Sequence, residues 1–146
     1  MPSVMDTYVE NREMVQPNHA NALGTTHGGN VVRWMDEVGV MAAMRFSGHD
    51  CVTARMERVD FRRPISVGDA TLIQAYVYDT GETSMRVRIR AFREDLKSSE
   101  REVTTESRFV YVAVDDEGTP VSVPELTAAS DRGERLQREA LAEEDS

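Results

Sequence analysis

One aspartate stands in an apolar stretch and calls for a chemical explanation. Asp36 lies in a run of apolar residues, and a carboxylate buried without a partner costs several kcal/mol. On a helix it would share a face with Gly39 and Ala43, whose small side chains leave a gap that a ligand or a partner chain could fill. We therefore predict a functional role for Asp36, because groups with perturbed protonation cluster at functional sites. The alternative is a structural carboxylate whose hydrogen bonds are satisfied.

Two glycines, Gly28 and Gly29, precede this stretch at the point where a helix would begin. Amides at a helix N-terminus lack intrahelical acceptors and attract negative charge, and glycine lets a ligand approach the backbone closely. Such amides could stabilise the oxyanion that forms when a carbonyl is attacked. The simpler interpretation is that the glycines ease a tight turn into the helix.

The connection before the glycines carries two further polar candidates, Asn21 and His27. Asparagine can donate to a carbonyl or position a water, although in loops it more often caps its own turn. His27 could act as a base near neutral pH, although a loop histidine packed on a helix start is the commoner case. Three scattered histidines and the single cysteine, Cys51, form no metal-ligand spacing, so we expect neither a metal nor a cofactor.

A long helix must position Asp36. From Asn30 to Phe46 the apolar residues do not alternate but form a nearly continuous run, and its methionine and alanine content favours a helix over a strand. A helix so apolar on most of its circumference should be buried in the core. Glu37 should pair with Arg33 one turn away, and Gly48 should end the helix.

Segments with a period of two flank this helix and predict antiparallel strands. We expect them at Tyr8–Val15, at the edge of the sheet, and at Val52–Phe61, Thr71–Asp79, Ser84–Phe92 and Glu102–Val114. In the fourth, the apolar residues from Met85 to Ala91 face the core, whereas Arg86, Arg88 and Arg90 form a solvated face paired with acids. The helix can be buried only if the sheet wraps around it, which predicts one α+β domain over residues 1–125.

Composition limits what the chain can be. Its 146 residues fit a single domain, followed by a charged tail (126–146) that we predict to be a marginal helix or disordered. The net charge of −9 disfavours nucleic acid as a partner, and no apolar run approaches the roughly 20 residues of a membrane span. The start of the chain lacks the pattern of a signal peptide, and one cysteine fits a reducing compartment, so we expect a cytoplasmic protein.

Several segments together resemble one family. Asn21–Gly29, followed by Trp34–Glu37, resembles the signature of hotdog-fold acyl-CoA hydrolases, in particular the YciA-like enzymes and the cytosolic long-chain acyl-CoA hydrolases. Phe61–Asp69, Gly81–Met85 and Phe109–Asp115 agree with that family in the same order. The resemblance covers about residues 8–125, and several motifs in one order are more specific than any single motif.

The resemblance implies a hotdog fold, in which a five-stranded antiparallel sheet wraps a central α-helix. It also implies a dimer with a ten-stranded sheet, formed through the strand after the helix, and a trimer of such dimers as a hexamer. The implied activity is hydrolysis of fatty acyl-CoA to free acid and CoA, at sites shared by two chains. Asp36 would be the catalytic carboxylate, as general base or nucleophile, and Asn21 would assist it. In the mechanism that we expect, the amides of Gly28 and Gly29 hold the thioester carbonyl and its oxyanion. Many relatives carry an aromatic residue at the position of His27, which weakens its assignment as a base.

Coenzyme A would enter only as part of the substrate. Arginine binds phosphates in bidentate fashion, which makes Arg62 and Arg63 candidates for its phosphates; Ser84, Gly28 and His27 are further candidates for substrate contacts. Two other functions compete with hydrolysis. One is a non-catalytic acyl-CoA-binding module, which would gain little from a carboxylate in an apolar cleft. The other is a hydratase or dehydratase, which would need a histidine within the helix.

Overall fold

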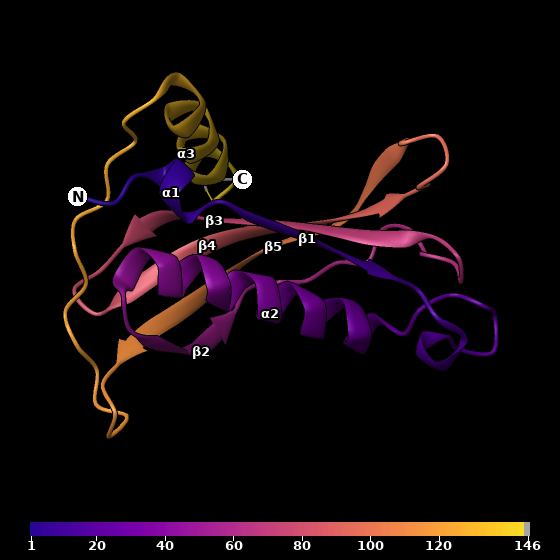
Figure 1. The fold of residues 1–146 in the computed structure, drawn as a ribbon, viewed down its shortest axis with the longest axis horizontal. Helices are drawn as coiled ribbons and strands as arrows, with labels where there is room; N and C mark the ends of the chain where they lie inside the picture. Colours follow the sequence, from indigo (N-terminus) through magenta and orange to yellow (C-terminus); the bar gives the residue numbers. More distant parts are fainter. Residues whose placement is uncertain (145–146) are drawn as a thin grey trace.

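The computed structural model describes residues 1–144, which form a curved sheet with one long helix against it (Figure 1). The elements in chain order are α1 (Val4–Thr7), β1 (Val9–Met14), η1 (Pro17–His19), α2 (Gly28–Ser47), β2 (Asp50–Met56), β3 (Ala70–Thr80), β4 (Ser84–Glu94), β5 (Arg101–Val114) and α3 (Asp131–Glu144). The predicted order of a strand, a long helix and four strands is confirmed. The short elements α1 and η1 were not predicted.

The five strands form one antiparallel sheet in the order β1-β3-β4-β5-β2, which confirms the α+β hotdog architecture and the edge position of β1. The strand predicted at Val52–Phe61 ends earlier, at Met56. Beyond Met56 the hydroxyl groups of Ser107 and Thr105 donate to the carbonyls of Glu57 and Asp60. These side-chain bonds stand beside backbone bonds from the amides of Glu57 and Arg62 to β5, so the segment follows β5 without a regular ladder.

The inner face of the sheet packs against α2. The alternating apolar positions of β3, β4 and β5 meet the buried face of the helix, where Met35, Ala42 and Ala43 are fully buried. The helix begins at Gly28 and ends at Gly48, which adopts φ 72° in the left-handed region that glycine favours. The ion pair predicted between Arg33 and Glu37 is present at 3.0 Å.

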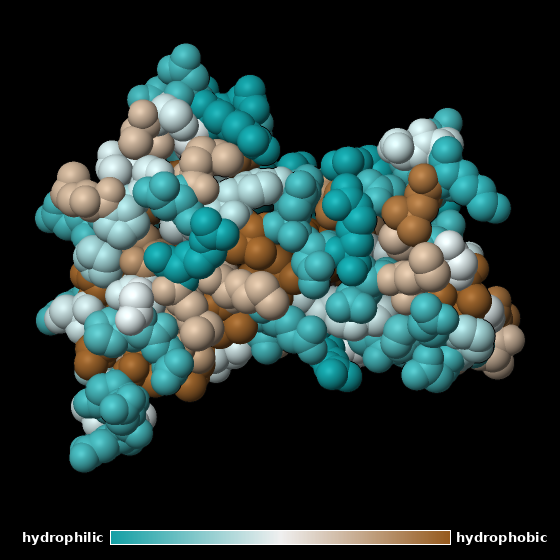
Figure 2. Space-filling model, viewed as in Figure 1, coloured by the Kyte–Doolittle hydropathy of each residue, from teal (hydrophilic) through white to brown (hydrophobic). Residues whose placement is uncertain are grey.

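The outer face of the sheet is covered in part by α3, the helix that holds most of the tail (Figure 1). Leu136 and Ala140 pack with Tyr76, Tyr78 and Val4 in a second, smaller apolar cluster. The surface of α3 that faces solvent is largely hydrophilic (Figure 2). The division between residues 1–125 and a separate tail stays a prediction.

The arginine row of β4 departs from its prediction at one position. Arg86, Arg88 and Arg90 lie on the outer face as expected, but the side chain of Arg88 is only 4% exposed. It is not solvated because α3 covers it: the guanidinium bonds to Glu139 at 3.4 Å and pairs with Glu143, both from that helix. No helix of the described chain is long and apolar enough to cross a membrane.

Candidate active site

Asp36 lies in the first half of α2, where two hydroxyl groups donate to its carboxylate. Thr53 Oγ1 donates to Oδ1 over 2.7 Å, and the Tyr111 hydroxyl donates to the same oxygen over 3.0 Å. The two donors stand opposite each other in the pairing of β2 with β5, so they reach the carboxylate from one row of the sheet. Within the described chain Oδ2 receives no hydrogen bond. One oxygen of Asp36 is therefore held in place and the other is open.

The gap expected beside Asp36 is filled from within the same chain, so that expectation is corrected. A Cβ added at Gly39 would overlap the Tyr111 hydroxyl and would lie 2.6 Å from Cδ1 of Ile89. Glycine is thus what lets the Tyr111 ring reach Asp36. Burial, followed by the negative charge of Asp36, raises the pKa of Tyr111 well above its ordinary range. The hydroxyl remains protonated and can donate at any ordinary pH.

Asn21 lies in the loop before α2, and the oxygen and nitrogen of its side-chain amide differ in their hydrogen bonding. Its carbonyl oxygen accepts from the backbone amides of Leu23 at 2.9 Å and Thr25 at 3.2 Å, which is the turn-capping role that asparagine commonly takes. The side-chain amide nitrogen has no acceptor within residues 1–144. The capping bonds therefore fix the side chain while leaving its donor available.

Gly28 and Gly29 form the first turn of α2, and His27 is the exposed residue before them. Their amides belong to the first turn, which has no intrahelical acceptor. A Cβ at Gly28 would lie 3.0 Å from the ring of Phe61, whereas a Cβ at Gly29 would meet nothing within 4 Å. Within residues 1–144, a ligand could therefore approach Gly29, whereas the ring of Phe61 covers Gly28. The His27 side chain makes no capping hydrogen bond.

A cavity of about 360 Å³ adjoins this end of the helix. Its wall includes Gly28, Phe61, Arg62 and Arg63, so the structure brings two predicted phosphate-binding arginines to the helix start. Arg63 also lies 3.7 Å from Glu102, while Arg62 pairs with no acid in the described residues. The cavity therefore has uncompensated positive charge beside apolar wall.

Ser84 is not part of this group. It begins β4 and stands opposite Val112, next to the row that holds Tyr111, whereas Arg62 bonds through its amide to Thr104, at the other end of β5. The structure therefore separates the predicted residues into two sets. One lies around Asp36 and the other lies around the N-terminus of α2. Within residues 1–144, no group of three or more histidine, cysteine or acidic side chains is placed to hold a metal.

The fold and these two sets of residues can be compared with known proteins. The family model of the thioesterase superfamily matches residues 23–100. The chain is 32% identical over 127 residues to the uncharacterized acyl-CoA thioester hydrolase YkhA of Bacillus subtilis, covering 87% of this chain and 74% of that protein. It is 34% identical over 116 residues to the acyl-CoA thioester hydrolase YciA of Escherichia coli, covering 77% and 88%. The chain belongs to the hotdog-fold acyl-CoA thioesterase family.

Solved structures of the family agree. An acyl-CoA hydrolase from Staphylococcus aureus, determined with butyryl coenzyme A, coenzyme A and coenzyme A disulfide, superposes with a TM-score of 0.87 at 29% identity, covering 96% of this chain and 85% of that one. Alanine variants of that enzyme at a threonine, an asparagine and an aspartate have also been solved. A hexameric acyl-CoA thioesterase superposes with a TM-score of 0.88 at 35% identity, covering 99% and 94%.

Thr53 and Tyr111 were missed from the sequence. Tyr111 occupies an inward position of β5 between Phe109 and Ala113, and a buried tyrosine hydroxyl needs a partner, so that position carried a usable signal. Thr53 carried none, because an isolated threonine in a strand is ordinary. The register shift between Thr53 and Arg55 marks a β-bulge, a feature that re-aims neighbouring side chains.

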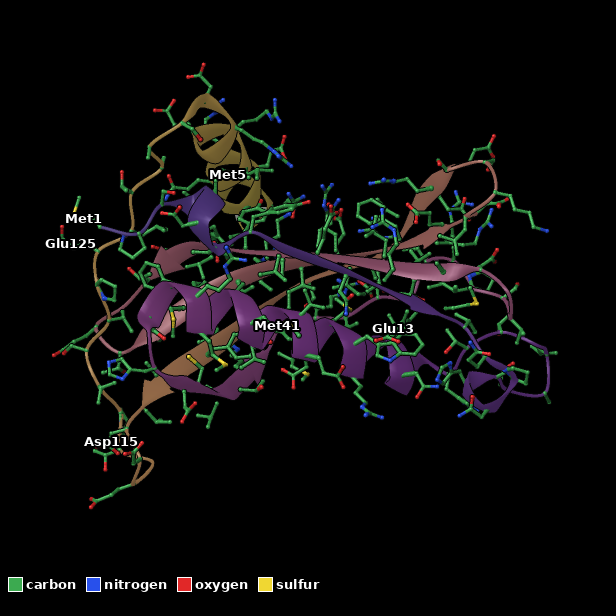
Figure 3. All side chains as sticks on the ribbon, viewed as in Figure 1. Met1, Met5, Glu13, Met41, Asp115 and Glu125 are labelled. Carbon is green, nitrogen blue, oxygen red and sulfur yellow. The ribbon has the colours of Figure 1, made fainter. Side chains whose placement is uncertain are left out.

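The strand that holds Thr53 is an exposed edge. Among residues 1–144, β2 pairs only with β5, and most of its residues are exposed, including Val52 at 51%. Met41 (Figure 3) and Met44 of α2 are exposed as well, at 43% and 41%. Apolar surface is visible over this part of the molecule (Figure 2). Asp36 therefore lies beside an unpaired sheet edge with apolar residues around it.

Proposed function

We propose that the chain hydrolyses the thioester of fatty acyl-CoA, releasing the free acid and CoA, with Asp36 as the catalytic carboxylate. The observation that carries this proposal is the asymmetric setting of Asp36. Oδ1 accepts from Thr53 and Tyr111, while Oδ2 is open. A carboxylate fixed through one oxygen presents the other at a defined position, as a base or a nucleophile requires.

Two routes use Oδ2. As a general base, it takes a proton from water while the water oxygen bonds to the carbonyl carbon; the C–S bond then breaks and the CoA thiolate takes up a proton. As a nucleophile, Oδ2 itself bonds to that carbon and releases the thiolate, leaving an anhydride that water hydrolyses. A single turnover in ¹⁸O-water tests for attack of water on the aspartyl side of an anhydride, because only this reaction places label within Asp36. A general base, or attack of water on the acyl carbon of the anhydride, places the label in the released acid, so trapping of the anhydride with hydroxylamine separates those two cases.

The oxyanion donors for this Asp36 are proposed to come from a second chain. Gly29 lies seven residues before Asp36 on α2, which corresponds to about 10 Å along the helix axis. One thioester carbonyl is too small to contact both. A partner chain would supply the amides of Gly28 and Gly29, with the free side-chain amide of Asn21 beside them.

The Staphylococcus aureus variants support this set of residues. The asparagine, aspartate and threonine replaced there are spaced along that chain as Asn21, Asp36 and Thr53 are spaced in this one. Thr53 therefore joins the proposed site, as the donor that orients Oδ1.

Self-association through β2 is the proposed route to such a shared site. The edge strand has free backbone groups along one side, and exposed apolar residues surround it. Pairing two copies through β2 would give a ten-stranded sheet and bring Thr53 and Asp36 to the junction. Three such dimers would make a hexamer, the assembly of one solved relative.

The arginine-lined cavity is the proposed site for the phosphates of the substrate's CoA. Arg62 and Arg63 line it beside Gly28, and guanidinium groups bind phosphate oxygens in bidentate fashion. His27 adjoins the same helix start and Ser84 lies at the Asp36 end, so we assign them to the two ends of the substrate path. Coenzyme A takes part as a portion of the substrate.

The activity is tested by thiol release from acyl-CoA of several chain lengths. Asp36→Asn should lower kcat about 10²–10⁴-fold, because it removes the base while keeping the shape of the side chain. Glu37→Gln is the matched control, since Glu37 is the next carboxylate on the helix and pairs with Arg33 on the exposed side. Asp36→Asn with unchanged kcat would refute the assignment. Binding without thiol release from any chain length would favour a binding module.

The shared site is tested by mixing two inactive chains. Asp36→Asn and Asn21→Ala subunits are co-expressed with different tags, and the mixed oligomer is purified. If one site takes Asn21 and Asp36 from different chains, each mixed dimer regains one intact site and about half of the wild-type activity. If both residues come from one chain, every site stays defective. Absence of recovered activity in a verified mixed dimer would therefore disprove the shared site.

A further inference from the structure

A second cavity, of about 260 Å³, lies on the outer face of the sheet beneath α3. Its wall includes Arg90 from β4, Arg132 and Arg135 from α3, Gln74 from β3 and Tyr8. The sheet carries α2 on its inner face, so this cavity and the Asp36 site lie on opposite sides of the sheet (Figure 1). The proposed thioesterase mechanism uses none of these residues.

Three arginines of this cavity lack an acidic partner. Most other arginines of the described chain form ion pairs with acids, but Arg90, Arg132 and Arg135 form none. The one acid in the wall, Glu139, bonds to Arg88 at 3.4 Å. Three like charges that face one cavity repel each other. The chain has 26 acidic residues and a net charge of −9, yet none of these acids pairs with the three arginines in the described residues.

Two of these guanidinium groups are held in place by aromatic rings. Arg132 lies 5.0 Å from the centre of the Tyr8 ring, and Arg90 lies 5.1 Å from that of Phe92. Arg90 also donates to Gln74 at 3.2 Å. Arg135 follows Arg132 by three residues, so both project from one face of α3 toward the sheet. The charges converge from two elements and are oriented before any ligand arrives.

We propose that this cavity is a binding site for a phosphate-bearing small molecule. The planar guanidinium fork matches phosphate oxygens, and its charge compensates a dianion. One water molecule occupies about 10–15 Å³ of cavity volume. The cavity measures about 260 Å³, which gives room for a diphosphate group. A ligand held by Arg90 on one side and by Arg132 and Arg135 on the other would join α3 to the sheet and stabilise its docking.

The proposal is tested by calorimetric titration of the full chain with sodium pyrophosphate, against sodium chloride at matched ionic strength. The double variant Arg132→Gln/Arg135→Gln should bind pyrophosphate at least tenfold more weakly. Arg138→Gln is the matched control, because Arg138 lies on the same helix, is exposed, and is not part of the cavity. Arg90→Gln should weaken binding as well, which covers the case in which the double variant loosens α3 itself.

The source of the phosphate is identified by a second titration with CoA and with its 3′-dephospho form. Tighter binding of CoA than of pyrophosphate, lost in Arg90→Gln, would identify the substrate's own phosphates; pyrophosphate binding alone would identify a separate phosphorylated ligand. The proposal would be overturned if neither pyrophosphate nor CoA bound. It would also be overturned if Arg138→Gln weakened binding as much as the double variant does. Thiol release is measured separately, so an inactive Asp36→Asn chain that still binds pyrophosphate keeps the two proposals apart.

Discussion

The two faces of the sheet are covered by helices of opposite character. On the inner face, α2 meets β3, β4 and β5 through buried apolar side chains, and almost every contact is non-directional. On the outer face, α3 contributes Leu136 and Ala140 to a small apolar cluster. Most of its other contacts are polar: Tyr76 donates to the carbonyl of Leu136 at 2.7 Å, and Arg88 is paired with acids of α3.

Because of this difference, the packing of α2 contributes to folding itself, whereas the docking of α3 can change in the folded chain. Apolar burial is large and is not weakened by charge screening, so α2 belongs to the cooperative core. Part-exposed ion pairs contribute little each and weaken with salt, so α3 can detach at a lower cost than global unfolding. The candidate catalytic carboxylate lies on α2, and the arginine cavity lies under α3.

The largest expected contrast is between a substitution on each face. Ile89→Ala removes a fully buried inner side chain and should lower the free energy of unfolding by about 2–5 kcal/mol. Leu136→Ala should instead increase hydrogen exchange throughout α3 while changing global unfolding far less. Denaturant titration and hydrogen exchange by mass spectrometry measure the two effects. An equal global loss in both variants would show that α3 is part of the same cooperative unit.

A second test concerns the close packing beside Asp36. Gly39→Ala should cost about 1–3 kcal/mol, because its methyl group would overlap the Tyr111 hydroxyl and approach Ile89. Gly29→Ala is the control in the same helix, since its Cβ meets nothing within 4 Å. Adding Tyr111→Phe should recover part of the loss. Thermal melting of the three variants and the wild type checks this, and a Gly39→Ala chain as stable as wild type would contradict the described packing.

The smallest expected effect is electrostatic and belongs to the outer face. A hydrogen bond from Arg12 holds the pKa of Glu94 below its ordinary value of 4.5. The unfolded chain therefore binds a proton more readily, so the stabilisation is complete above pH 4.5 and is lost as pH falls through the lower pKa of the folded state.

Arg12→Gln should accordingly lower stability at pH 7 by about 1 kcal/mol or less, because Arg12 is itself partly exposed. The loss should diminish as pH falls below 4.5, where the carboxyl group becomes protonated in both chains. Chemical denaturation at pH 7, 4.5 and 3 measures it. A difference that stays constant down to pH 3 would mean that Arg12 acts through packing rather than charge.

The fold was predictable because its elements have strong periods. Alternation from Met85 to Ala91 identified the inner face of β4, and the long apolar run identified α2. The early end of β2 was not predictable, because it depends on hydroxyl groups of Ser107 and Thr105 that lie far along the chain. The burial of Arg88 was missed for the same reason: the helix that covers it could not be docked from its own thin apolar stripe.

Asn21 was predicted from the family resemblance, and Asp36 from a conflict between its residue type and its surroundings. Asp36 in an apolar helix is such a conflict, and it led to the carboxylate. Of its partners, Thr53 creates no conflict, since it suits the strand that holds it, and the buried hydroxyl of Tyr111 signals only that some partner is needed. What links the three is a contact between a helix and two strands, which no local pattern encodes. The same holds for the arginine cavity, which forms only when α3 meets β4.

The exposed edge of β2 has a consequence for the lifetime of the protein in a cell. A newly made chain that has not met a partner presents unpaired backbone groups beside Val52, Met41 and Met44. Such an edge is a target for chaperones and for aggregation, and locally open segments are cleaved first. If copies pair through β2, slow synthesis would leave more chains solitary for longer. A larger fraction of the chains would then be degraded when the concentration is low. The steady-state amount of the protein would therefore rise more steeply than its rate of synthesis.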